Sequence, residues 1–334
     1  MSEDADGITI RATRPDDRSG VLRLLRSSLG WGDDDRYEAL FAWKHDENPA
    51  GRSPSWVALD DEGVVGFRTF LRWELERAGE PVRAVRAVDT ATDPRVQGRG
   101  IFRRLTLGAV DALHEDDVDL IFNTPNDASR PGYLKMGWQL LGRVPIAARP
   151  RSPRAVLHMA TARTSADRWS EAGRGGIAAA EVFADESGVA RLLAARRPAT
   201  ALRTRLTPAH LRWRYGTGLL GYRAVLASPE DGVEGGLAVY RVRRRGRARE
   251  AALCLVLVPG DDRGTHRRLT GAVGRASGAD YVLAAGPDAA IRNGLVPLPR
   301  QGPVLTARPV GTGSAATPPP LTGWDLTLGD LELF

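Results

Sequence analysis

The sequence predicts an α/β protein made of two tandem domains with the same order of elements. Three observations lead to this prediction. The chain has 334 residues, a length that suits two domains. Its first half contains an apolar, β-branched run followed by a glycine turn and an amphipathic helix. Its second half repeats the local patterns of the first half in the same order, as tandem domains do.

The first half alternates short strand and helix patterns. The predicted strands are 8–11, 55–60, 64–76, 81–92, 120–122 and a segment over 138–149 that breaks into two near Gly142. An Asp-Glu-Gly turn joins the second strand to the third, as in a hairpin. Helical periodicity is present after Asp16-Asp17, which can cap a helix running to Ser28, and again over 33–45.

The most informative stretch joins the strand that ends at Thr92 to the helix that starts after Gly100. Asp93-Pro94 stops the strand, and Gly98 and Gly100 allow a tight turn. A helix N-terminus offers unpaired N–H groups and partial positive charge, which favours phosphate binding; a purely steric turn is the alternative. The spacing lacks the third glycine of a dinucleotide fingerprint and the Gly-Lys-Ser/Thr of a P-loop.

The segment Arg95-x-x-Gly98-x-Gly100 resembles the pyrophosphate-binding motif of the GNAT acyltransferases, which use acyl-coenzyme A as donor. The next segment agrees in order, with a short strand, then Asn126 and Tyr133, as in the family pattern after its fifth strand. This resemblance implies a mixed, mostly antiparallel and twisted sheet flanked by helices in the first half. Because the second half repeats the first, it implies two tandem GNAT-like domains.

The resemblance also implies where acetyl-CoA, or another acyl-CoA, would bind as co-substrate. The pantetheine arm would lie beside the end of the fourth strand, and the pyrophosphate at the glycine turn. The residues expected to bind it are Thr90, Ala91, Thr92, Arg95, Val96, Gln97, Gly98, Arg99, Gly100, Ile101, Phe102, Asn126, Ser129 and Tyr133. By the same resemblance Tyr133 is the expected general acid for the leaving thiolate; a packed core tyrosine is the alternative.

The segment from Trp43 to Pro49 is the predicted acceptor side, because the family places such a segment beside its acceptor site. The expected substrate-binding residues are Trp43, His45 and Glu47. No general base is evident. Asp89 and His45 are the catalytic candidates, with Glu47 beside them, and the amine could instead lose its proton to water. An ordinary loop with Trp43 in the core is the alternative for the whole segment.

The second half repeats the first through local matches. These are Leu40–His45 with His210–Tyr215, Arg103–Thr106 with Arg267–Thr270, and Val118–Phe122 with Ala279–Leu283. The motif itself is lost, because Asp261 and Asp262 stand where the pyrophosphate turn should be, and carboxylates would repel a phosphate. We therefore expect the second domain to be structural or to form a wall of the acceptor site.

The predicted limits are a GNAT domain over 1–150, a linker or bridging helix over 151–175 and a degenerate GNAT-like domain over 176–334. Within the last of these, strands are expected at 177–183 and at 324–334. The final segment is a candidate for pairing across the molecule.

Composition argues against several other classes of protein. The formal net charge is +6, but all of the 47 basic residues except Lys44 and Lys135 are arginines, which indicates codon bias rather than a nucleic-acid surface. One cysteine and 5 scattered histidines lack metal-ligand spacing, so no metal is expected. The polar start and the short apolar runs predict a cytoplasmic protein with no signal peptide and no membrane partner.

The resemblance to the GNAT acyltransferases therefore implies an acyl-CoA-dependent N-acyltransferase, which transfers an acyl group to an amine of a small molecule or peptide by direct attack. A coenzyme A-binding regulatory or scaffold protein without turnover is one alternative. A transferase that uses long-chain or aminoacyl donors is another. The sequence leaves the acyl length, the acceptor and the oligomeric state open.

Overall fold

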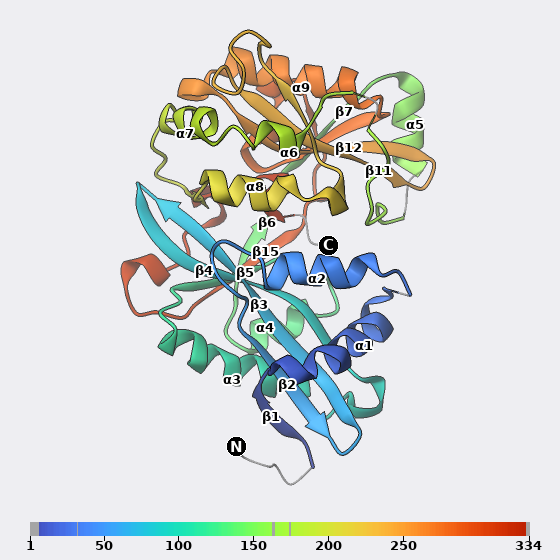
Figure 1. Ribbon diagram of the computed structural model, residues 1–334, viewed down its shortest axis with the longest axis vertical. Coiled ribbons are helices and arrows are strands. Elements are labelled where there is room, and N and C mark those ends of the chain that lie inside the picture. Colours follow the sequence, from blue (N-terminus) through green and yellow to red (C-terminus); the bar gives the residue numbers. More distant parts are fainter. Residues whose placement is uncertain (1–6, 32, 162–163, 174, 332–334) are drawn as a thin grey trace. The chain divides into compact units, whose positions relative to one another are not determined.

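The computed structural model describes residues 7–31, 33–161, 164–173 and 175–331. Within these ranges the chain is mixed α/β, with two mixed sheets flanked by helices, as the sequence predicted (Figure 1). The chain divides into two compact units. Unit 1 comprises Met1–Leu75, Pro81–Gly142 and Val304–Pro320, and unit 2 comprises Glu76–Glu80, Arg143–Pro303 and Leu321–Phe334.

The sheet of unit 1 has the order β1-β2-β3-β4-β5-β15-β6. β2 pairs antiparallel with both β1 and β3, β4 pairs parallel with β5, and β5 pairs antiparallel with β15. The strands are β1 (Thr9–Ala12), β2 (Ser55–Asp60), β3 (Gly63–Arg77), β4 (Glu80–Thr92), β5 (Leu120–Asn123), β15 (Val304–Pro309) and β6 (Gln139–Arg143). Unit 2 also contains two short strands, β9 (Leu202–Thr204) and β16 (Trp324–Asp325), which pair parallel with each other.

Helices cover both faces of this sheet, because neighbouring residues of a strand point to opposite faces. Phe67 of β3 contacts Phe41, with ring centroids 6.1 Å apart, whereas Arg68 contacts Tyr133. One face is therefore covered by α2 (Arg36–His45), with α1 (Arg18–Leu29) beside it, and the other by α3 (Ile101–Glu115) and α4 (Arg130–Lys135). In α3 the buried residues Ile101, Leu105, Ala109 and Leu113 form one helical stripe.

Unit 2 repeats this order of elements. Its sheet runs β14-β7-β13-β12-β11-β10-β8, and β12 pairs parallel with β13 as β4 does with β5. The strands are β14 (Val296–Pro297), β7 (Ile146–Pro150), β13 (Tyr281–Ala285), β12 (Ala248–Leu257), β11 (Leu237–Arg245), β10 (Arg223–Leu226) and β8 (Ile177–Ala178). The helices are α5 (Pro153–Thr161), α6 (Ala179–Val182), α7 (Glu186–Ala194), α8 (Pro208–Gly216), α9 (Arg263–Ser277) and α10 (Leu328–Leu331).

Each sheet contains a strand from a distant part of the chain. β7 directly follows β6 in sequence but pairs with β13 of the second sheet. β15, from the last part of the chain, pairs with β5 of the first sheet. The predicted limits at 150 and 176 follow the continuity of the chain, whereas the two compact units exchange β7 and β15.

Two local predictions in unit 2 are wrong. The strand expected over 177–183 ends at Ala178, because Ala179–Val182 forms α6, and alanine favours helix. The final strand is limited to Trp324–Asp325, because Leu328–Leu331 forms α10. That turn is stabilised by the Asp330 carboxylate, which accepts the Thr327 N–H at 2.7 Å. Residues 332–334 of the predicted strand lie outside the described residues.

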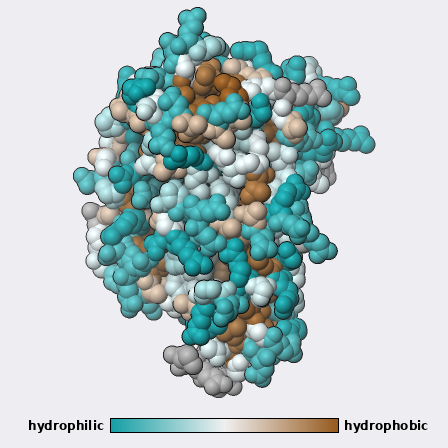
Figure 2. All heavy atoms as spheres, in the orientation of Figure 1, coloured by the Kyte–Doolittle hydropathy of each residue, from teal (hydrophilic) through white to brown (hydrophobic). Residues whose placement is uncertain are grey.

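Arginine occurs both at the surface and in the interior. On the face drawn in Figure 2 hydrophilic residues predominate, and the hydrophobic residues form separate patches. The interior contains several arginines that are almost fully buried, namely Arg68, Arg86, Arg214 and Arg241. The buried arginines are unusual, because arginine is almost never fully buried unless it is paired.

None of the described helices combines the length and the apolar composition needed to cross a bilayer.

A fragment truncated after residue 150 is expected to be less stable than the full chain. It lacks β15, so the fully buried β5 side chains Leu120, Ile121 and Phe122 would lie on an unprotected edge strand. We expect the melting temperature to fall by at least about 5 °C, from a loss of roughly 2 kcal/mol or more. Circular dichroism of both proteins measures this. Joining residues 304–320 to the fragment should restore stability, and equal melting temperatures without that segment would contradict the prediction.

Candidate active site

The turn before α3 contains two glycines in the left-handed region and has open space beside it. Gly98 and Gly100 have φ of 82° and 72°, in the left-handed region that favours glycine. A Cβ atom at either position would have no neighbour within 4 Å, so the space beside the turn is open. Asp93 stabilises the turn by accepting a hydrogen bond from the N–H of Arg95 at 2.9 Å. The residues present therefore fit a pyrophosphate held by backbone N–H groups.

The Arg95 side chain is already engaged at this turn. Its guanidinium forms ion pairs with Asp93, at 3.1 Å, and with Glu62. Arg99 is exposed, as Arg95 is, but among the described residues no ion pair joins it to a carboxylate. Of the two arginines predicted to bind the phosphate, Arg99 is thus the one whose charge is less compensated by neighbouring carboxylates.

β4 and β5 separate on the side where the pantetheine arm is expected. They pair only from Ala84 to Arg86 of β4, while β4 itself continues to Thr92. In the part of β4 that is not paired with β5, Asp89 has φ of 41°. A positive φ is uncommon for a residue other than glycine, and it marks a local irregularity of the strand. The side chains of Asp89 and Thr90 bond to groups on opposite faces of the sheet.

Tyr133 lies on the face covered by α3 and α4 and is 5% exposed. Its ring meets Phe102 edge-on, with centroids 5.4 Å apart, and Trp138 at 5.1 Å. Its hydroxyl oxygen accepts a hydrogen bond from Nη1 of Arg68 at 2.7 Å. Because the oxygen accepts that bond, its own proton remains available for another acceptor.

Arg68 is a fully buried cation, with an exposed fraction of 0%. Its Nη1 also donates to the hydroxyl of Thr90, and its guanidinium lies 4.4 Å from the ring centroid of Phe70. Among the described residues, Nε and Nη2 are buried without a hydrogen-bond partner. A buried positive charge at this point favours any negative charge that develops on a neighbouring group.

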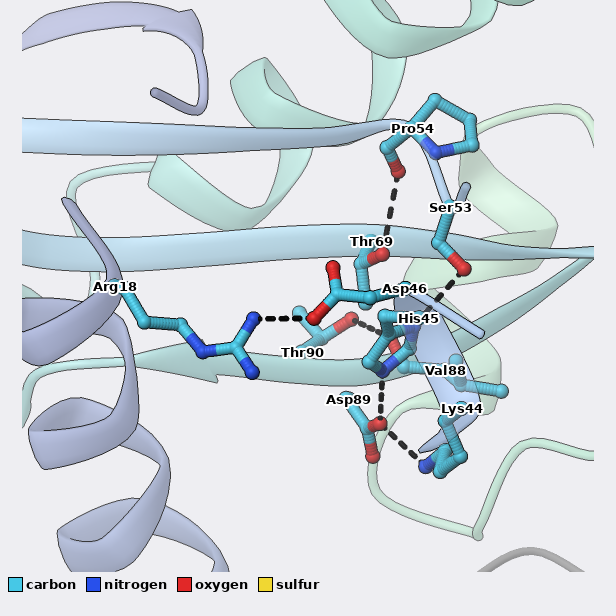
Figure 3. Close-up of polar contacts among 10 residues, drawn as sticks. All are labelled: Arg18, Lys44, His45, Asp46, Ser53, Pro54, Thr69, Val88, Asp89 and Thr90. Atoms are coloured by element: carbon cyan, nitrogen blue, oxygen red, sulfur yellow. Dashed lines mark hydrogen bonds and ion pairs between the residues drawn. The ribbon is translucent and has the colours of Figure 1, made fainter. Parts of the chain in front are cut away.

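On the opposite face, the last turn of α2, the segment just before β2 and the irregular part of β4 bring four side chains together, namely Lys44, His45, Ser53 and Asp89 (Figure 3). Oδ2 of Asp89 lies 2.8 Å from Nε2 of His45 and forms an ion pair with Lys44. Nδ1 of His45 lies 3.0 Å from Oγ of Ser53. Lys44 and His45 are each 3% exposed, and the Asp89 side chain is 7% exposed. This cluster is thus a continuous, nearly water-free chain of hydrogen bonds.

The surroundings of the cluster determine its protonation. Burial by itself raises the pKa of Asp89, but the charge of Lys44 and the hydrogen bond from His45 outweigh it and hold that pKa well below its ordinary range. Burial lowers the pKa of His45, although Asp89 acts in the opposite direction. A neutral His45 then donates its Nε2–H to the carboxylate of Asp89 and accepts the Ser53 hydroxyl at Nδ1.

A cavity of about 250 Å³ adjoins this cluster. Aromatic and polar side chains line it, among them Phe41, His45, Ser53, Phe67 and Thr69. Because Ser53 both lines the cavity and bonds to His45, a hydrogen-bonded path runs from the cavity to Asp89. The path therefore connects the cavity to His45 and, through it, to Asp89 of β4.

The comparison with protein families concerns the first part of the chain. Residues 9–141 match the family model described as the acetyltransferase (GNAT) domain. This part of the chain is a GNAT domain. The comparison with curated proteins found no match.

Solved structures share the fold over most of the chain. A protein of Enterococcus faecalis V583, described as a probable N-acyltransferase, has 13% identity and a TM-score of 0.61, covering 91% of this chain and 72% of its own. A GCN5-related N-acetyltransferase from Anabaena variabilis has the same identity and TM-score, with 91% and 73% covered. Another from Kribbella flavida has 16% identity and a TM-score of 0.59, with 91% and 72% covered. At these identities the likeness shows the fold.

Four other residues predicted for the site lie outside the cavity and the hydrogen-bonded cluster, namely Asn126, Ser129, Trp43 and Glu47. Oδ1 of Asn126 accepts bonds from the N–H and the hydroxyl of Ser129, at 2.8 and 2.9 Å, and so holds the start of α4. Trp43 is buried and Glu47 is exposed, and neither lines the cavity. Within the described ranges, no group of three or more His, Cys, Asp or Glu side chains could hold a metal ion.

Sequence reasoning missed three residues of the GNAT domain that contact the predicted catalytic groups. Arg68 bonds Tyr133, Lys44 pairs with Asp89, and Ser53 bonds His45. A signal existed for Arg68, since it is the one charged residue within the run from Gly63 to Leu71. Lys44 and Ser53 carry no local signal, because each acquires its partner only through long-range packing.

In unit 2 the counterpart of the gap between β4 and β5 is filled by the chain itself. β12 and β13 pair from Glu250 to Ala252 of β12. A Cβ atom at Gly329 would lie 2.6 Å from the carbonyl oxygen of Cys254 in β12, and one at Gly286, just after β13, would lie 1.8 Å from that of Leu326. Glycine permits both close approaches. The segment around Leu326 and Gly329 therefore packs against both strands.

Proposed function

We propose that the GNAT domain of unit 1 is an acyl-CoA-dependent N-acyltransferase acting on an amine of a small molecule or peptide. The observation that supports this most is the path from the cavity through Ser53 and His45 to Asp89. The path ends on β4, and the next residue, Thr90, is bonded to the same arginine as Tyr133. A candidate proton acceptor and a candidate proton donor thus both lie beside the end of β4, and acyl transfer to an amine needs one of each.

Acetyl-CoA, or another acyl-CoA, is the proposed co-substrate. The open turn at Gly98 and Gly100 offers backbone N–H groups for its pyrophosphate. The end of β4 that is not paired with β5, from Thr90 to Thr92, would bind the pantetheine arm. A backbone N–H of this segment would polarise the thioester carbonyl. The thioester supplies the activated acyl group.

In this proposal His45 accepts the proton of the attacking amine, through the hydroxyl of Ser53. Ser53 would pass a proton to Nδ1 of His45 and receive one from the amine, so its own charge does not change. The carboxylate of Asp89 stabilises the imidazolium that forms. Tyr133 donates its proton to the sulfur as the carbon–sulfur bond breaks and the carbon–nitrogen bond forms. Arg68 holds the Tyr133 hydroxyl in position.

Release of free thiol from acetyl-CoA, measured with a panel of amines, tests the proposal. We expect turnover with at least one amine, in proportion to the amine added. If coenzyme A binds but no combination of amine and acyl-CoA donor releases free thiol, the result would contradict catalysis and favour a regulatory or scaffold protein.

His45→Gln is expected to lower kcat/KM by about 100-fold, because it removes the proton acceptor. His114→Gln is the matched control, since His114 is an exposed residue in the last turn of α3. The same assay measures both variants. A His45→Gln enzyme within threefold of wild type would show that the amine loses its proton elsewhere, for example to water.

The pH dependence should reflect the same group. His45 acts as a base only when neutral, that is, above its pKa, and burial lowers that pKa. We therefore expect kcat/KM to remain constant as the pH is lowered to about 6.5, the ordinary pKa of histidine. The fall in kcat/KM should be centred at a pH below that value. A profile of kcat/KM against pH measures this. A fall centred above 6.5 that disappears in His45→Gln would contradict the direction of the shift.

A further inference from the structure

Unit 2 has a cavity of its own, of about 400 Å³, next to the start of α9. It lies where the degenerate copy of the phosphate turn ends, and its volume is that of a small-molecule site. Its charged lining consists of the arginines Arg196, Arg197, Arg203, Arg263 and Arg292, the acids Asp261, Asp288, Asp325 and Asp330, and His266. All of these residues belong to unit 2.

Of the three other acids of this cavity, Asp261 and Asp330 already accept hydrogen bonds from the protein, and Oδ2 of Asp261 accepts the N–H of Arg197 at 3.3 Å. Oδ1 of Asp330 accepts the Thr204 hydroxyl at 2.7 Å, and its Oδ2 accepts both the N–H and the hydroxyl of Thr327. Arg203 is paired with Glu76 at 2.8 Å. The carboxylate of Asp330 therefore has little capacity left for a ligand, and Arg203 has its counter-charge.

Three of the arginines differ from Arg203. Among the described residues, no hydrogen bond or ion pair joins the guanidinium of Arg196, Arg263 or Arg292 to a partner. Burial lowers the pKa of Arg196, and the charge of Arg203 acts in the same direction, although the charges of Asp261, Glu76 and Asp325 oppose both. An anion beside this guanidinium would stabilise its charged form.

Asp288 adds a second, independent observation. It is 5% exposed, and its Oδ2 is buried without a hydrogen-bond partner among the described residues. Its other oxygen lies 3.4 Å from Nε2 of His266, which is likewise buried without a hydrogen bond. Burial, with the charges of Asp325 and Asp330, raises the pKa of Asp288 to about 8. At neutral pH the group carries a proton and offers a donor to the cavity.

We propose that this cavity binds a small phosphorylated molecule. The planar guanidinium groups match the oxygens of a phosphate, and the protonated carboxyl of Asp288 adds a further donor. The ligand is smaller than an acyl-CoA, because residues around Leu326 and Gly329 fill the gap between β12 and β13 that a pantetheine arm would need. The site is thus separate from the acyl-CoA site proposed for unit 1.

Calorimetric titration of the full chain with inorganic pyrophosphate tests the proposal. We expect Arg196→Met and Arg292→Met each to weaken binding by about 10-fold or more, as loss of one charge-assisted hydrogen bond does. Arg275→Met is the matched control, since Arg275 is an exposed arginine of α9 that lines a different cavity. All variants share the phosphate turn of α3, so only the cavity of unit 2 distinguishes them.

The outcomes are separable. Weakening in Arg196→Met and Arg292→Met but not in Arg275→Met supports the site. Equal affinity in all the proteins, weakening in Arg275→Met alone, or no binding to wild type would overturn it. Should Arg196→Met fail to fold, Arg292→Met decides by itself, because Arg292 is exposed and its replacement leaves no cavity in the core.

Discussion

Tyr133→Phe is expected to lower kcat by about 10²–10⁴-fold, the usual contribution of general acid catalysis. The substitution removes the proton donor but keeps the ring between Phe102 and Trp138. Affinity for coenzyme A should change little, because the lost interaction strengthens only as the thiolate forms. Steady-state kinetics at saturating donor, together with coenzyme A titration, measures both quantities.

Removing the hydroxyl also has a structural cost, because Arg68 loses one of its two hydrogen-bond acceptors. Unit 2 offers a matched control, since Nη1 of Arg214 donates to the buried hydroxyl of Tyr222 at 2.6 Å. Tyr222→Phe should lower the melting temperature to a similar extent, with a loss of about 1–3 kcal/mol, and leave kcat nearly normal. If Tyr133→Phe behaves in the same way, with kcat within threefold of wild type, Tyr133 is a packed core residue and not the acid.

Gly100→Glu is expected to weaken acyl-CoA binding by about 10³-fold. The new side chain would enter the open space beside the turn and set a carboxylate against the pyrophosphate. Two or more charge-assisted hydrogen bonds, each contributing about 1.5–3 kcal/mol, would be lost. Calorimetry should show one acyl-CoA site per wild-type chain and none in the variant over the same concentration range.

Gly108→Glu is the control for charge, because Gly108 lies on the same helix with open space around it and an ordinary helical φ. It should leave affinity nearly unchanged. Gly100→Ala separates backbone strain from ligand repulsion, since a side chain at φ of 72° costs about 1 kcal/mol without adding charge. Two sites per wild-type chain, or unchanged affinity in Gly100→Glu, would show that the turn of unit 1 is not the only acyl-CoA site.

Most of the local structure could be predicted from the sequence. The strand that ends at Thr92, the glycine turn and α3 were predicted because an apolar run, two glycines and a helical stripe are adjacent in the chain. Unit 2 shows the limit of such patterns, since the run at 177–183 was predicted as a strand and forms α6 after Ala178. Short apolar segments satisfy both periodicities, and packing decides between them.

The candidate site divides in the same way. His45, Asp89 and Tyr133 were each named from the sequence, but their partners Lys44, Ser53 and Arg68 were not. An ionised carboxylate, a neutral imidazole and a buried guanidinium are properties of an environment. They exist only after distant elements exclude water and bring the groups within hydrogen-bond distance.

The exchange of β7 and β15 was likewise decided by the tertiary structure alone. Each strand has an ordinary apolar pattern that would suit either sheet. The choice of partner depends on register and on burial of both strands against residues more than a hundred positions away. The sequence by itself determined which segments are strands and helices and where the phosphate turn lies, because these depend on neighbours in the chain. Strand partners and side-chain protonation depend on neighbours in space.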